Sequence, residues 1–588
     1  MADALNISCS ILGQPWRWRG GNLDGRDAGF RPDDLVSSLL MARGCARESL
    51  DIHRNPTIRT FMPDPSLFRD MDTASTRLAD AVERKENVAI FGDYDVDGAT
   101  SAALLVRLLR ALGLTPRFYI PDRLMEGYGP SGEALVRLGE EGSRLIVTVD
   151  CGAQAFEALS QARAAGIDVI VVDHHKCATA LPETFALVNP NRLDECAEGA
   201  AHGHLAAVGV AFLLAAALVR ELRARNYFSD RPEPRIMDLL DLVALGTVAD
   251  VAQLRGLNRA FVAQGLKVMA QRQNTGLAAL LDASKLQRAP LAHDLGFALG
   301  PRINAGGRVG RSDLGVRLLT THDPEEARTL AEELNRLNEE RRTIEAAVQD
   351  EAERLAALQL SRAVVIVAGT GWHPGVIGIV AGRLKERLKR PTIVIAIDAE
   401  GVGKGSGRSI AGVDLGAAVL AAKDAGLLAA GGGHAMAAGL TVASGNIEPL
   451  AAFLDERLAA DVTRASGEQA LSIDAVLSIG GVNPEMVRAM DAGGPYGVGW
   501  PAPRIVAGPA RVVRADIVGT GHVRAILAGN DGCSVKTVAF RQADTELGQA
   551  LLGAPRDRRL WVAGRAKIDD WGSRPAAEIH VDDAAWAD

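Results

Sequence analysis

Short, continuous apolar runs alternate with helical stretches from about residue 87 onward. The first three runs are Val88 to Phe91, Leu145 to Val149 and Val169 to Val172, and each precedes polar or glycine residues and then a helical pattern. Strands that are buried on both faces of a parallel sheet have this appearance, because helices cover both sides. The pattern therefore predicts an α/β domain.

A segment rich in Glu and Arg, with almost no Gly or Pro, separates this domain from a second one. It runs from Pro324 to Leu360 and predicts one long helix, whose apolar positions are Leu330, Leu334, Leu337, Ile344 and Val348. The heptad-like spacing lasts only about three heptads, which favours a packed connecting helix over a dimerising coiled coil. Further apolar runs, Val364 to Val367 and Thr392 to Ile397, predict a second α/β domain.

After about residue 465 the runs become short and alternating, as in His522 to Leu527 and Ser534 to Phe540, with a turn signal at Gly529 to Gly532. This pattern predicts a small β-barrel or sandwich. The expected organisation is an N-terminal lead-in (1–80) packed on the first α/β domain (81–323), a connecting helix (324–360), a second α/β domain (361–464) and a β-domain (465–588).

The composition is consistent with this division into domains and restricts the class of protein. The 588 residues are too many for one core. The longest apolar run, Leu205 to Val219, is shorter than the roughly 20 residues that a bilayer requires, and no signal-like segment opens the chain. The six cysteines are scattered, which predicts neither disulfides nor a thiolate zinc site. We expect a cytoplasmic protein with no membrane contact.

Acidic and imidazole side chains follow the predicted strands. In open α/β sheets ligands bind at the carboxyl ends of the strands, so residues that are distant in sequence meet there. The residues concerned are Asp93, Asp95 and Asp97 after the first run, Asp150 after the second, Asp173, His174 and His175 after the third, and Asp250 after a helical stretch.

So many converging carboxylates would repel one another unless cations lie between them. Oxygen and imidazole donors without thiolates suit Mn²⁺ or Mg²⁺, with Mn²⁺ the first choice. Two such ions would fit the two-metal arrangement of phosphoester hydrolysis. The competing interpretation is that an Asp after a strand caps the next helix, but this explains at most one of Asp93, Asp95 and Asp97.

The sequence resembles the DHH phosphoesterase superfamily and, within it, the RecJ family of single-strand-specific exonucleases. The motifs are GDYDVDG at 92–98, TVDCG at 148–152, VVDHH at 171–175 and TVADV at 247–251. An EGYG segment (126–129) and a GPRINAGGR segment (300–308) also match, and residues 361–464 resemble the DHH-associated domain. Several family members have a histidine where this chain has Phe91.

The resemblance implies roles residue by residue. Asp173 would orient the histidines, and His175 would face the scissile phosphate as an acid or transition-state stabiliser. Asp150 would bridge two metal ions, and the complete implied ligand set is Asp93, Asp95, Asp97, Asp150, His174 and Asp250.

Glycine-rich segments of the second α/β domain carry cations that suit an anion. Backbone N–H groups in such loops approach anions closely, and Arg binds phosphate in a bidentate manner. Without the resemblance, a tight turn and a solvated salt bridge explain the same residues. The family resemblance makes Arg308, Ser406 and Arg408 candidates for a 5′-phosphate pocket. Arg123 is a weaker candidate for the same pocket, and His434 is a candidate for contact with the substrate backbone.

The β-domain contains a basic window. Residues 501–567 hold eleven Lys or Arg against five acids, within a chain of net charge −8. With Trp500 and Phe540 this is typical of an oligonucleotide-binding (OB) fold, although two aromatics are more often core residues.

We therefore expect a two-metal 5′→3′ exonuclease on single-stranded DNA that releases 5′-mononucleotides in repair and recombination. Polarity, DNA preference and partners such as a single-strand-binding protein or a RecQ-like helicase are implied only by the resemblance. Two alternatives are a short-oligonucleotide or cyclic-dinucleotide phosphodiesterase, and a catalytically silent scaffold.

Overall fold

The structure is a computed structural model that describes residues 3–25, 31–123, 125–467, 470–569 and 575–587. The chain divides into two compact units. One contains residues 63–252 and 264–468, and the other contains residues 1–62, 253–263 and 469–588. Among the described residues, no helix has the length and apolar character needed to span a bilayer.

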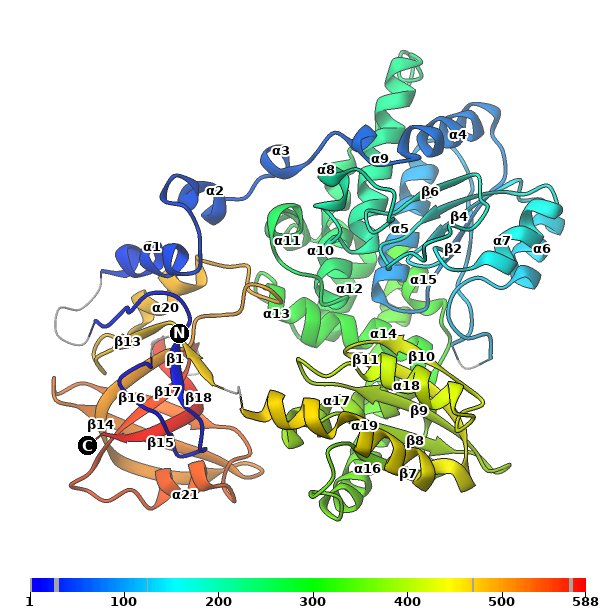
Figure 1. Cartoon of the computed structure of the whole chain (residues 1–588). Coiled ribbons are helices and arrows are strands. Elements are labelled where there is room, and N and C mark those ends of the chain that lie inside the picture. The colour runs from blue at the N-terminus through cyan, green and yellow to red at the C-terminus, as the bar shows by residue number, and fades with distance from the viewer. Residues whose placement is uncertain (1–2, 26–30, 124, 468–469, 570–574, 588) are drawn as a thin grey trace. The chain divides into compact units, whose positions relative to one another are not determined.

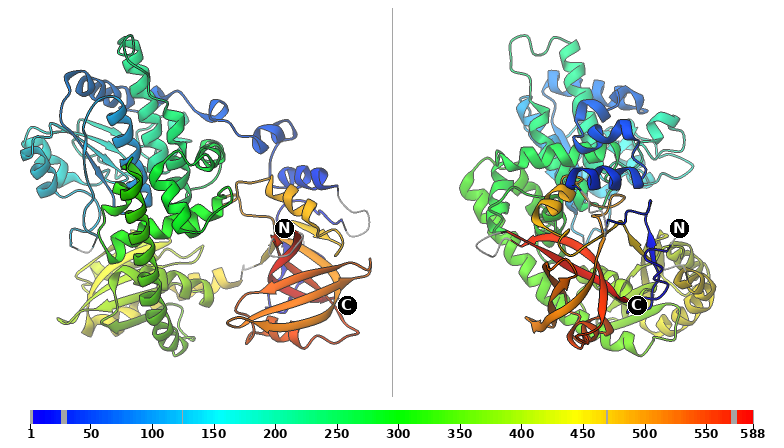
Figure 2. Two further views of the ribbon diagram at one scale, coloured as in Figure 1. Left: turned by 180° about the vertical axis from the view of Figure 1, so that it is seen from behind. Right: turned by 90° about the vertical axis from the view of Figure 1, so that its left-hand side faces the viewer.

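The larger unit contains the first predicted α/β domain, built on a five-stranded parallel sheet in the order β3-β2-β4-β5-β6. The strands are β2 (Val88–Gly92), β3 (Arg117–Tyr119), β4 (Leu145–Val149), β5 (Asp168–Val172) and β6 (Ala186–Val188). Apolar side chains of α6 (Gly132–Glu140) and α7 (Phe156–Ala164) pack on one face. The other face contacts α4 (Met71–Arg84), α5 (Val96–Ala111) and α9 (Ala207–Ala224) (Figures 1 and 2).

A helical region follows the sheet and ends in the long connecting helix. Its members are α10 (Leu240–Ala249), α11 (Gly256–Ala270), α12 (Thr275–Ala283), α13 (Ala292–Asp294), a π-helical turn (Leu295–Leu299), α14 (Gly300–Val309), α15 (Leu314–Thr320) and α16 (Pro324–Ala357). The prediction of one long helix is confirmed by α16, which buries Leu330, Leu334, Leu337 and Val348. Asp323 caps it by accepting a hydrogen bond from the Glu325 N–H.

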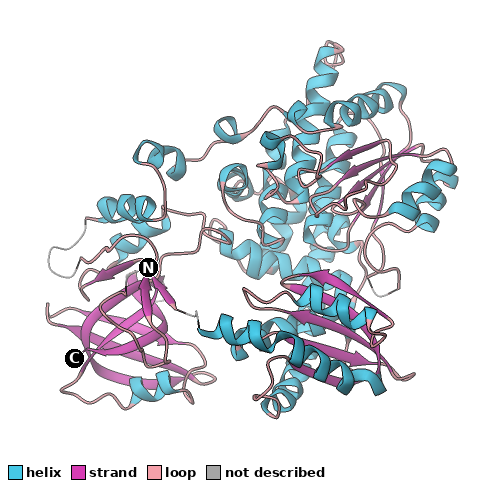
Figure 3. Ribbon diagram, in the orientation of Figure 1, coloured by secondary structure: helices cyan, strands magenta, loops and turns pink. Residues whose placement is uncertain are grey.

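The second α/β domain is a mixed five-stranded sheet in the order β10-β11-β9-β8-β7 (Figure 3). Its elements are β7 (Val365–Thr370), α17 (Pro374–Leu388), β8 (Thr392–Ile397), β9 (Val402–Arg408), α18 (Leu415–Asp424), β10 (Ala430–His434), β11 (Ala437–Ala443) and α19 (Ile447–Gly467). Side chains of α16 and α17 share one core with the sheet, and those of α18 and α19 share the other.

The smaller unit contains the predicted β-domain as a closed barrel, because β14 (Ile505–Val518) pairs with both β15 (His522–Gly529) and β17 (Arg559–Asp569). The circuit continues through β16 (Ser534–Ala539) and β18 (Ala576–Ala587). Further elements of this unit are β1 (Trp16–Trp18), α1 (Pro32–Ala42), α2 (Leu50–Arg54), α3 (Ile58–Phe61), β12 (Leu471–Ile473), β13 (Ala475–Leu477), α20 (Pro484–Asp491) and α21 (Glu546–Leu552).

The N-terminal lead-in differs from the sequence expectation. Residues 1–62 belong to the unit that holds the barrel, not to the first α/β domain. The strand β1 pairs in parallel with β12, and Trp16 and Trp18 join a core with Ile473 and Trp561. The buried Asp583 accepts a hydrogen bond from Trp16 Nε1 (2.9 Å), so the Trp-Arg-Trp cluster is a core element.

Candidate metal centre and anion pocket

The loop after β2 places three carboxylates at the carboxyl edge of the first sheet. Asp93 is buried, and Asp95 is the N-cap of α5, accepting from the N–H groups of Asp97 (2.8 Å) and Gly98 (3.1 Å). The helix α5 therefore starts at Val96. Gly98 is required here, because a Cβ at this position would lie 2.4 Å from the Asp93 carbonyl oxygen.

Asp97 has a second structural role that the sequence did not indicate. Its Oδ2 accepts from the Ala207 N–H (2.6 Å) and its Oδ1 from the Val208 N–H (3.0 Å), so this buried carboxylate holds the first turn of α9. Two of the three acids in the loop are therefore helix caps. Capping uses oxygen lone pairs but leaves others available, since each ionised carboxylate has about four acceptor sites.

Asp150 and His174 face each other across neighbouring strand ends. His174 Nδ1 lies 3.0 Å from the Leu205 carbonyl oxygen, which places the ring proton on Nδ1. The lone pair on Nε2 then points at Asp150 Oδ1, 3.3 Å away. Two acceptors at this distance repel one another unless a cation lies between them.

Unpaired buried atoms mark the same place. Among the described residues, no hydrogen-bond partner reaches Asp93 Oδ1, Asp150 Oδ1 or His174 Nε2. The ligand atoms of three groups lie within 4.8 Å of one another: Asp150 with His174 and His175, Asp97 with His174 and Asp250, and Asp93 with Asp95 and Asp150. The structure thus brings together every acid and imidazole that the sequence placed here.

The electrostatics agree with a cation site. Burial, reinforced by neighbouring carboxylates, raises the pKa of Asp93, Asp97 and Asp150 well above the usual range. Burial and the charge of Asp95 raise the pKa of Asp250 to about 7. Burial and the charge of His175 lower the pKa of His174 to about 4, which keeps it neutral and able to ligate. This donor set fits a hard divalent cation.

His175 stands in a different environment from its neighbour. Its Nδ1 lies 2.7 Å from Asp173 Oδ1. Burial opposes the imidazolium, but the hydrogen bond and charge of Asp173 outweigh it and raise the pKa of His175. Burial likewise opposes the Asp173 carboxylate, yet the two imidazoles and the Ala153 N–H lower its pKa to about 2. The pair is suited to hold a proton beside the cluster.

Two asparagines and a tyrosine that the sequence analysis did not assign fix the histidine segment. Asn191 Nδ2 donates to the His174 carbonyl oxygen (2.6 Å) and Asn189 Nδ2 donates to that of His175 (2.8 Å). The Tyr128 hydroxyl lies 3.1 Å from His175 Nδ1 and also donates to the Asp150 carbonyl oxygen. The available signal for the asparagines was their position directly after the strand β6, at the same sheet edge.

An arginine cluster lies in the same compact unit. Arg308, in the last turn of α14, donates to the Gly375 carbonyl oxygen (2.8 Å), and Arg408 donates to Ser406 Oγ (3.0 Å). Burial and the charges of Arg123, Arg341 and Arg408 lower the pKa of Arg308 to about 9. Within the described parts of the chain, no carboxylate forms an ion pair with Arg123, Arg308 or Arg408.

Arg123 links the arginine cluster to the acids at the sheet edge, because its guanidinium lies over the Tyr94 ring (4.6 Å to the centroid) and its charge acts on Asp93.

His434 is exposed at the end of β10. The strand register places it opposite Ala437, which in turn lies opposite Arg408. His434 therefore shares a sheet face with Ser406 and Arg408, but no contact joins its side chain to theirs in the described structure.

The β-domain aromatics divide into two kinds. Trp500 packs on His53 (4.4 Å between centroids) and lies beside the guanidinium groups of Arg43 and Arg259, so it is an anchor and not a free stacking surface. Phe540 is about half exposed between His522 and His580.

The basic window also has partners outside its limits, since Lys536 pairs with Asp569 and Glu578. Across residues 470–588 there are 13 Lys or Arg and 14 acids.

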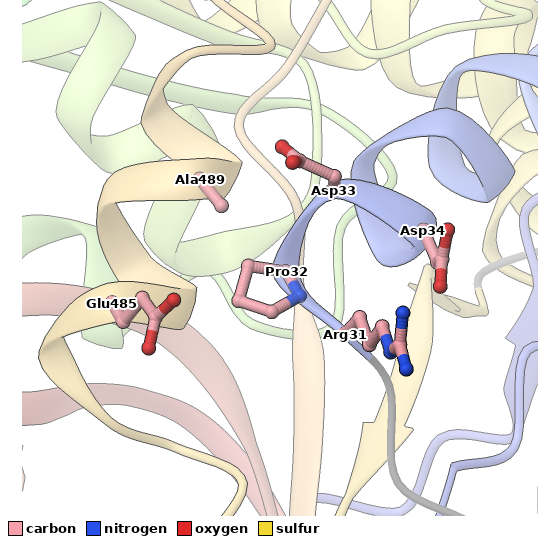
Figure 4. A pocket seen from close by; sticks show the side chains of 6 residues that line it. All are labelled: Arg31, Pro32, Asp33, Asp34, Glu485 and Ala489. Carbon is pink, nitrogen blue, oxygen red and sulfur yellow. The ribbon is translucent and has the colours of Figure 1, made fainter.

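A pocket of the smaller unit contains none of these groups. It lies between the start of α1 and α20 and is lined by Arg31, Pro32, Asp33, Asp34, Glu485 and Ala489 (Figure 4).

Comparison with known families defines the class of protein. Residues 87–247 match the N-terminal domain of the DHH family, residues 361–460 match the DHHA1 domain, and residues 473–583 match the RecJ OB domain. The fold and the strand-end acids are thus those of a DHH protein with an associated domain and an OB barrel.

Comparison with individual relatives defines the family within this class. The single-stranded-DNA-specific exonuclease RecJ of Escherichia coli K12 is 37% identical over 564 residues, covering 93% of this chain and 95% of the relative. That of Dickeya dadantii is 39% identical and covers 84% and 87%. The crystal structure of Thermus thermophilus RecJ with Mn²⁺ superposes with a TM-score of 0.77 at 30% identity, covering 97% of this chain and 80% of that one. The chain belongs to the RecJ family.

Proposed function

We propose that this chain is a Mn²⁺- or Mg²⁺-dependent 5′→3′ exonuclease that acts on single-stranded DNA. The observation that carries the proposal is the pairing of two opposite charge excesses in one compact unit. Buried carboxylate and imidazole atoms lack partners at the sheet edge, and an arginine cluster without acidic partners accompanies them. The RecJ relatives are named as single-stranded-DNA-specific exonucleases, which supports this substrate.

The metal ligands in this proposal are Asp93, Asp95, Asp97, Asp150, His174 and Asp250, with Asp150 in two of the three ligand groups and so placed to serve two ions. Divalent ions bound there would supply Lewis-acid activation of water and neutralisation of phosphate charge. RecJ of Thermus thermophilus has been solved with Mn²⁺ and with Mg²⁺, which supports either ion.

His175 is the proposed proton donor. Hydrolysis adds a water oxygen to phosphorus and breaks the bond between phosphorus and the 3′-oxygen of the terminal nucleotide. The leaving oxygen takes a proton, which His175 can hold because Asp173, at 2.7 Å, stabilises the imidazolium. The products are a 5′-mononucleotide and a strand that again ends in a 5′-phosphate.

The arginine cluster explains the polarity. A 5′-phosphate held by Arg308, Ser406 and Arg408 replaces the missing counter-charge, and the charge of Arg123 acts both on this cluster and on Asp93. Each cycle regenerates the group that the pocket binds. His434, on the same sheet face, is proposed to contact the strand beyond the terminal phosphate.

The remaining elements of the proposal rest on the family resemblance. They are a role in repair and recombination, a cytoplasmic location, and partners such as a single-strand-binding protein and a RecQ-like helicase. The proposed division of labour gives residues 81–323 the chemistry, residues 361–464 together with Arg308 the terminal phosphate, and residues 465–588 the trailing strand.

The test is a time course on a long single strand that carries a 5′-phosphate and a 3′ label, with Mn²⁺ and with EDTA, beside a blunt duplex. Progressive shortening of the single strand, absent with EDTA and on the duplex, supports the proposal. Immediate release of the labelled mononucleotide would reverse the polarity.

The pocket is tested separately with Arg408→Ala. The expected result is a rate loss of about 10-fold or more on 5′-phosphorylated strands, a much smaller loss on 5′-hydroxyl strands, and unchanged thermal stabilisation by Mn²⁺. Arg387→Ala, at an exposed ion pair of α17 with Glu353, is the matched control. Equal losses on both strand types would reject the anchor role.

A further inference from the structure

An exposed pair of aromatic rings lies on the helical stretch that carries Arg308 in its last turn. His293, on α13, and Phe297, on the π-helical turn, stack with centroids 4.4 Å apart and an interplanar angle of 24°. Phe297 is 69% exposed, while Leu295 and Leu299 on the same turn are fully buried. A single exposed apolar residue is common, so the position of this pair decides whether it matters.

The backbone under the rings is unusual. Residues Leu295–Leu299 form a π-helical turn between α13 and α14. Such turns are rare, and they are found frequently at functional sites. Here the turn buries both flanking leucines and directs Phe297 outward.

The turn is packed on the segments that carry the metal-centre acids. A Cβ added to Gly300 would lie 3.4 Å from Ala249 Cβ and 4.0 Å from Val96 Cγ2. Ala249 precedes Asp250, and Val96 stands between Asp95 and Asp97. The turn that carries Phe297 is therefore packed against the segments that hold Asp95, Asp97 and Asp250.

The opposite end of the same stretch is the anion pocket. Arg308 lies eleven residues after Phe297, about 16 Å along a helix at 1.5 Å per residue. One stretch of chain thus presents, in order, an aromatic surface, the backing of the metal centre and a buried arginine. Between them Arg302 donates to the Ala298 carbonyl oxygen (2.7 Å), so a cation lies on the same stretch.

We propose that Phe297, supported by His293, stacks on a nucleobase of the DNA strand on the 3′ side of the scissile phosphodiester. The assignment rests on the proposed exonuclease function and adds a base-binding residue to it. A strand whose 5′-phosphate is held at Arg308 and whose scissile phosphate is at the acids continues in the direction of the rings. Aromatic faces bind every base, so the contact holds single strands without reading sequence.

Stacking also bears on strand selection. A base can lie against Phe297 only when it is free of its own neighbours, as in single-stranded DNA. Paired and stacked bases of a duplex do not offer that face.

The experiment compares Phe297→Ala and Phe297→Trp with the wild-type protein on a 5′-phosphorylated single strand. Phe185→Ala is the matched control, because Phe185 is 42% exposed and precedes β6 at the opposite edge of the sheet. We expect Phe297→Ala to raise KM about fivefold or more with kcat little changed. Phe297→Trp should restore the wild-type KM, and Phe185→Ala should leave KM unchanged.

A second arm removes the base instead of the ring. Strands with abasic residues at successive positions behind the 5′ end should raise the wild-type KM at one or two positions, and Phe297→Ala should show no further loss there. Additive losses, or a KM for Phe297→Ala equal to that of Phe185→Ala, would overturn the stacking role and leave the rings as a surface for a protein.

If wild-type protein degrades no strand, the exonuclease proposal fails. Fluorescence anisotropy of a labelled strand with the same variants then still measures the contact: unchanged affinity in Phe297→Ala would also reject it.

Discussion

Two regions bury charge in opposite ways. Arg259, at 1% exposure in the smaller unit, donates to the carbonyl oxygens of His53 (3.1 Å), Pro495 (3.0 Å), Gly493 (2.9 Å) and Gly494 (2.5 Å). In the larger unit, Asp93, Asp150 and His174 each leave a buried polar atom without a partner among the described residues.

The contrast separates a structural charge from a functional one. A buried charge whose hydrogen bonds are complete stabilises the fold around it, and removal of either partner is costly. A buried charge with incomplete bonds lowers stability until a ligand supplies the missing partner. Substitutions at the two regions should therefore affect different properties.

The largest expected effect is on activity at the incomplete site. Asp150→Asn keeps the shape of the side chain but removes a charge that belongs to two ligand groups. We expect a rate loss of about a thousandfold or more, equivalent to about 4 kcal/mol of activation free energy, in single-strand degradation assays with Mn²⁺. Retention of more than a tenth of the wild-type rate would contradict the assignment of Asp150 as a ligand.

The next largest expected effect is a loss of folding stability at Arg259, whose hydrogen bonds are complete. Arg259→Met fills the volume but leaves four carbonyl groups without their donor, at a cost of about 3 kcal/mol. Calorimetry should show an unfolding midpoint about 6–12 °C lower. The exposed Arg511→Met is the control, and an equal change in both variants would show that Arg259 is not a structural anchor.

Metal binding should reverse the instability of the incomplete site. At about 100 times its Kd, Mn²⁺ should stabilise the wild-type protein by about 2.7 kcal/mol, seen as a rise in the unfolding midpoint. Asp150→Asn should lose this rise and, without metal, be no less stable than wild type. Asp294→Asn, which breaks the ion pair of the buried Asp294 with the half-exposed Arg288 (2.7 Å), should instead be destabilised and keep the rise. A metal-free Asp150→Asn that is clearly less stable than wild type would count against the idea.

The smallest expected effect is a pH dependence beside Arg259. Burial and the charges of Arg259 and Arg43 lower the pKa of His53 to about 4. Because the unfolded chain binds this proton near pH 6.5 and the folded chain only near pH 4, the stabilisation is complete above pH 6.5 and is lost as pH falls toward 4. Urea unfolding at pH 7 and pH 5 should differ by about 2 kcal/mol more for wild type than for His53→Phe. Identical pH dependences would exclude His53 as the titrating group.

The sheet edge was predictable from sequence because its signals are local. Continuous apolar runs located β4 and β8 at their observed limits, and every predicted acid or histidine follows a strand or helix whose end fixes its place. The helix caps by Asp97 and the asparagine contacts were not predictable, since their partners are 14 to 111 residues away.

The placement of residues 1–62 shows the limit most clearly. Trp16 to Trp18 have no local pattern that identifies a partner, because β12 lies about 450 residues further along the chain. Trp500 was likewise interpreted from composition, whereas its role is set by Arg43 and Arg259, which come from two other segments. Long-range pairing of this kind follows from tertiary packing and not from periodicity.

The double contact of Asp97 with the first turn of α9 has a consequence for the speed of the site. Both oxygens are already oriented by the Ala207 and Val208 N–H groups, so this proposed ligand has little rotamer freedom to lose when an ion binds. Preorganisation of this kind shifts the entropic cost of ion capture to the folding of the chain. If Asp97 binds an ion, we expect ion exchange at this carboxylate to be set by dehydration of the metal and not by rearrangement of the protein.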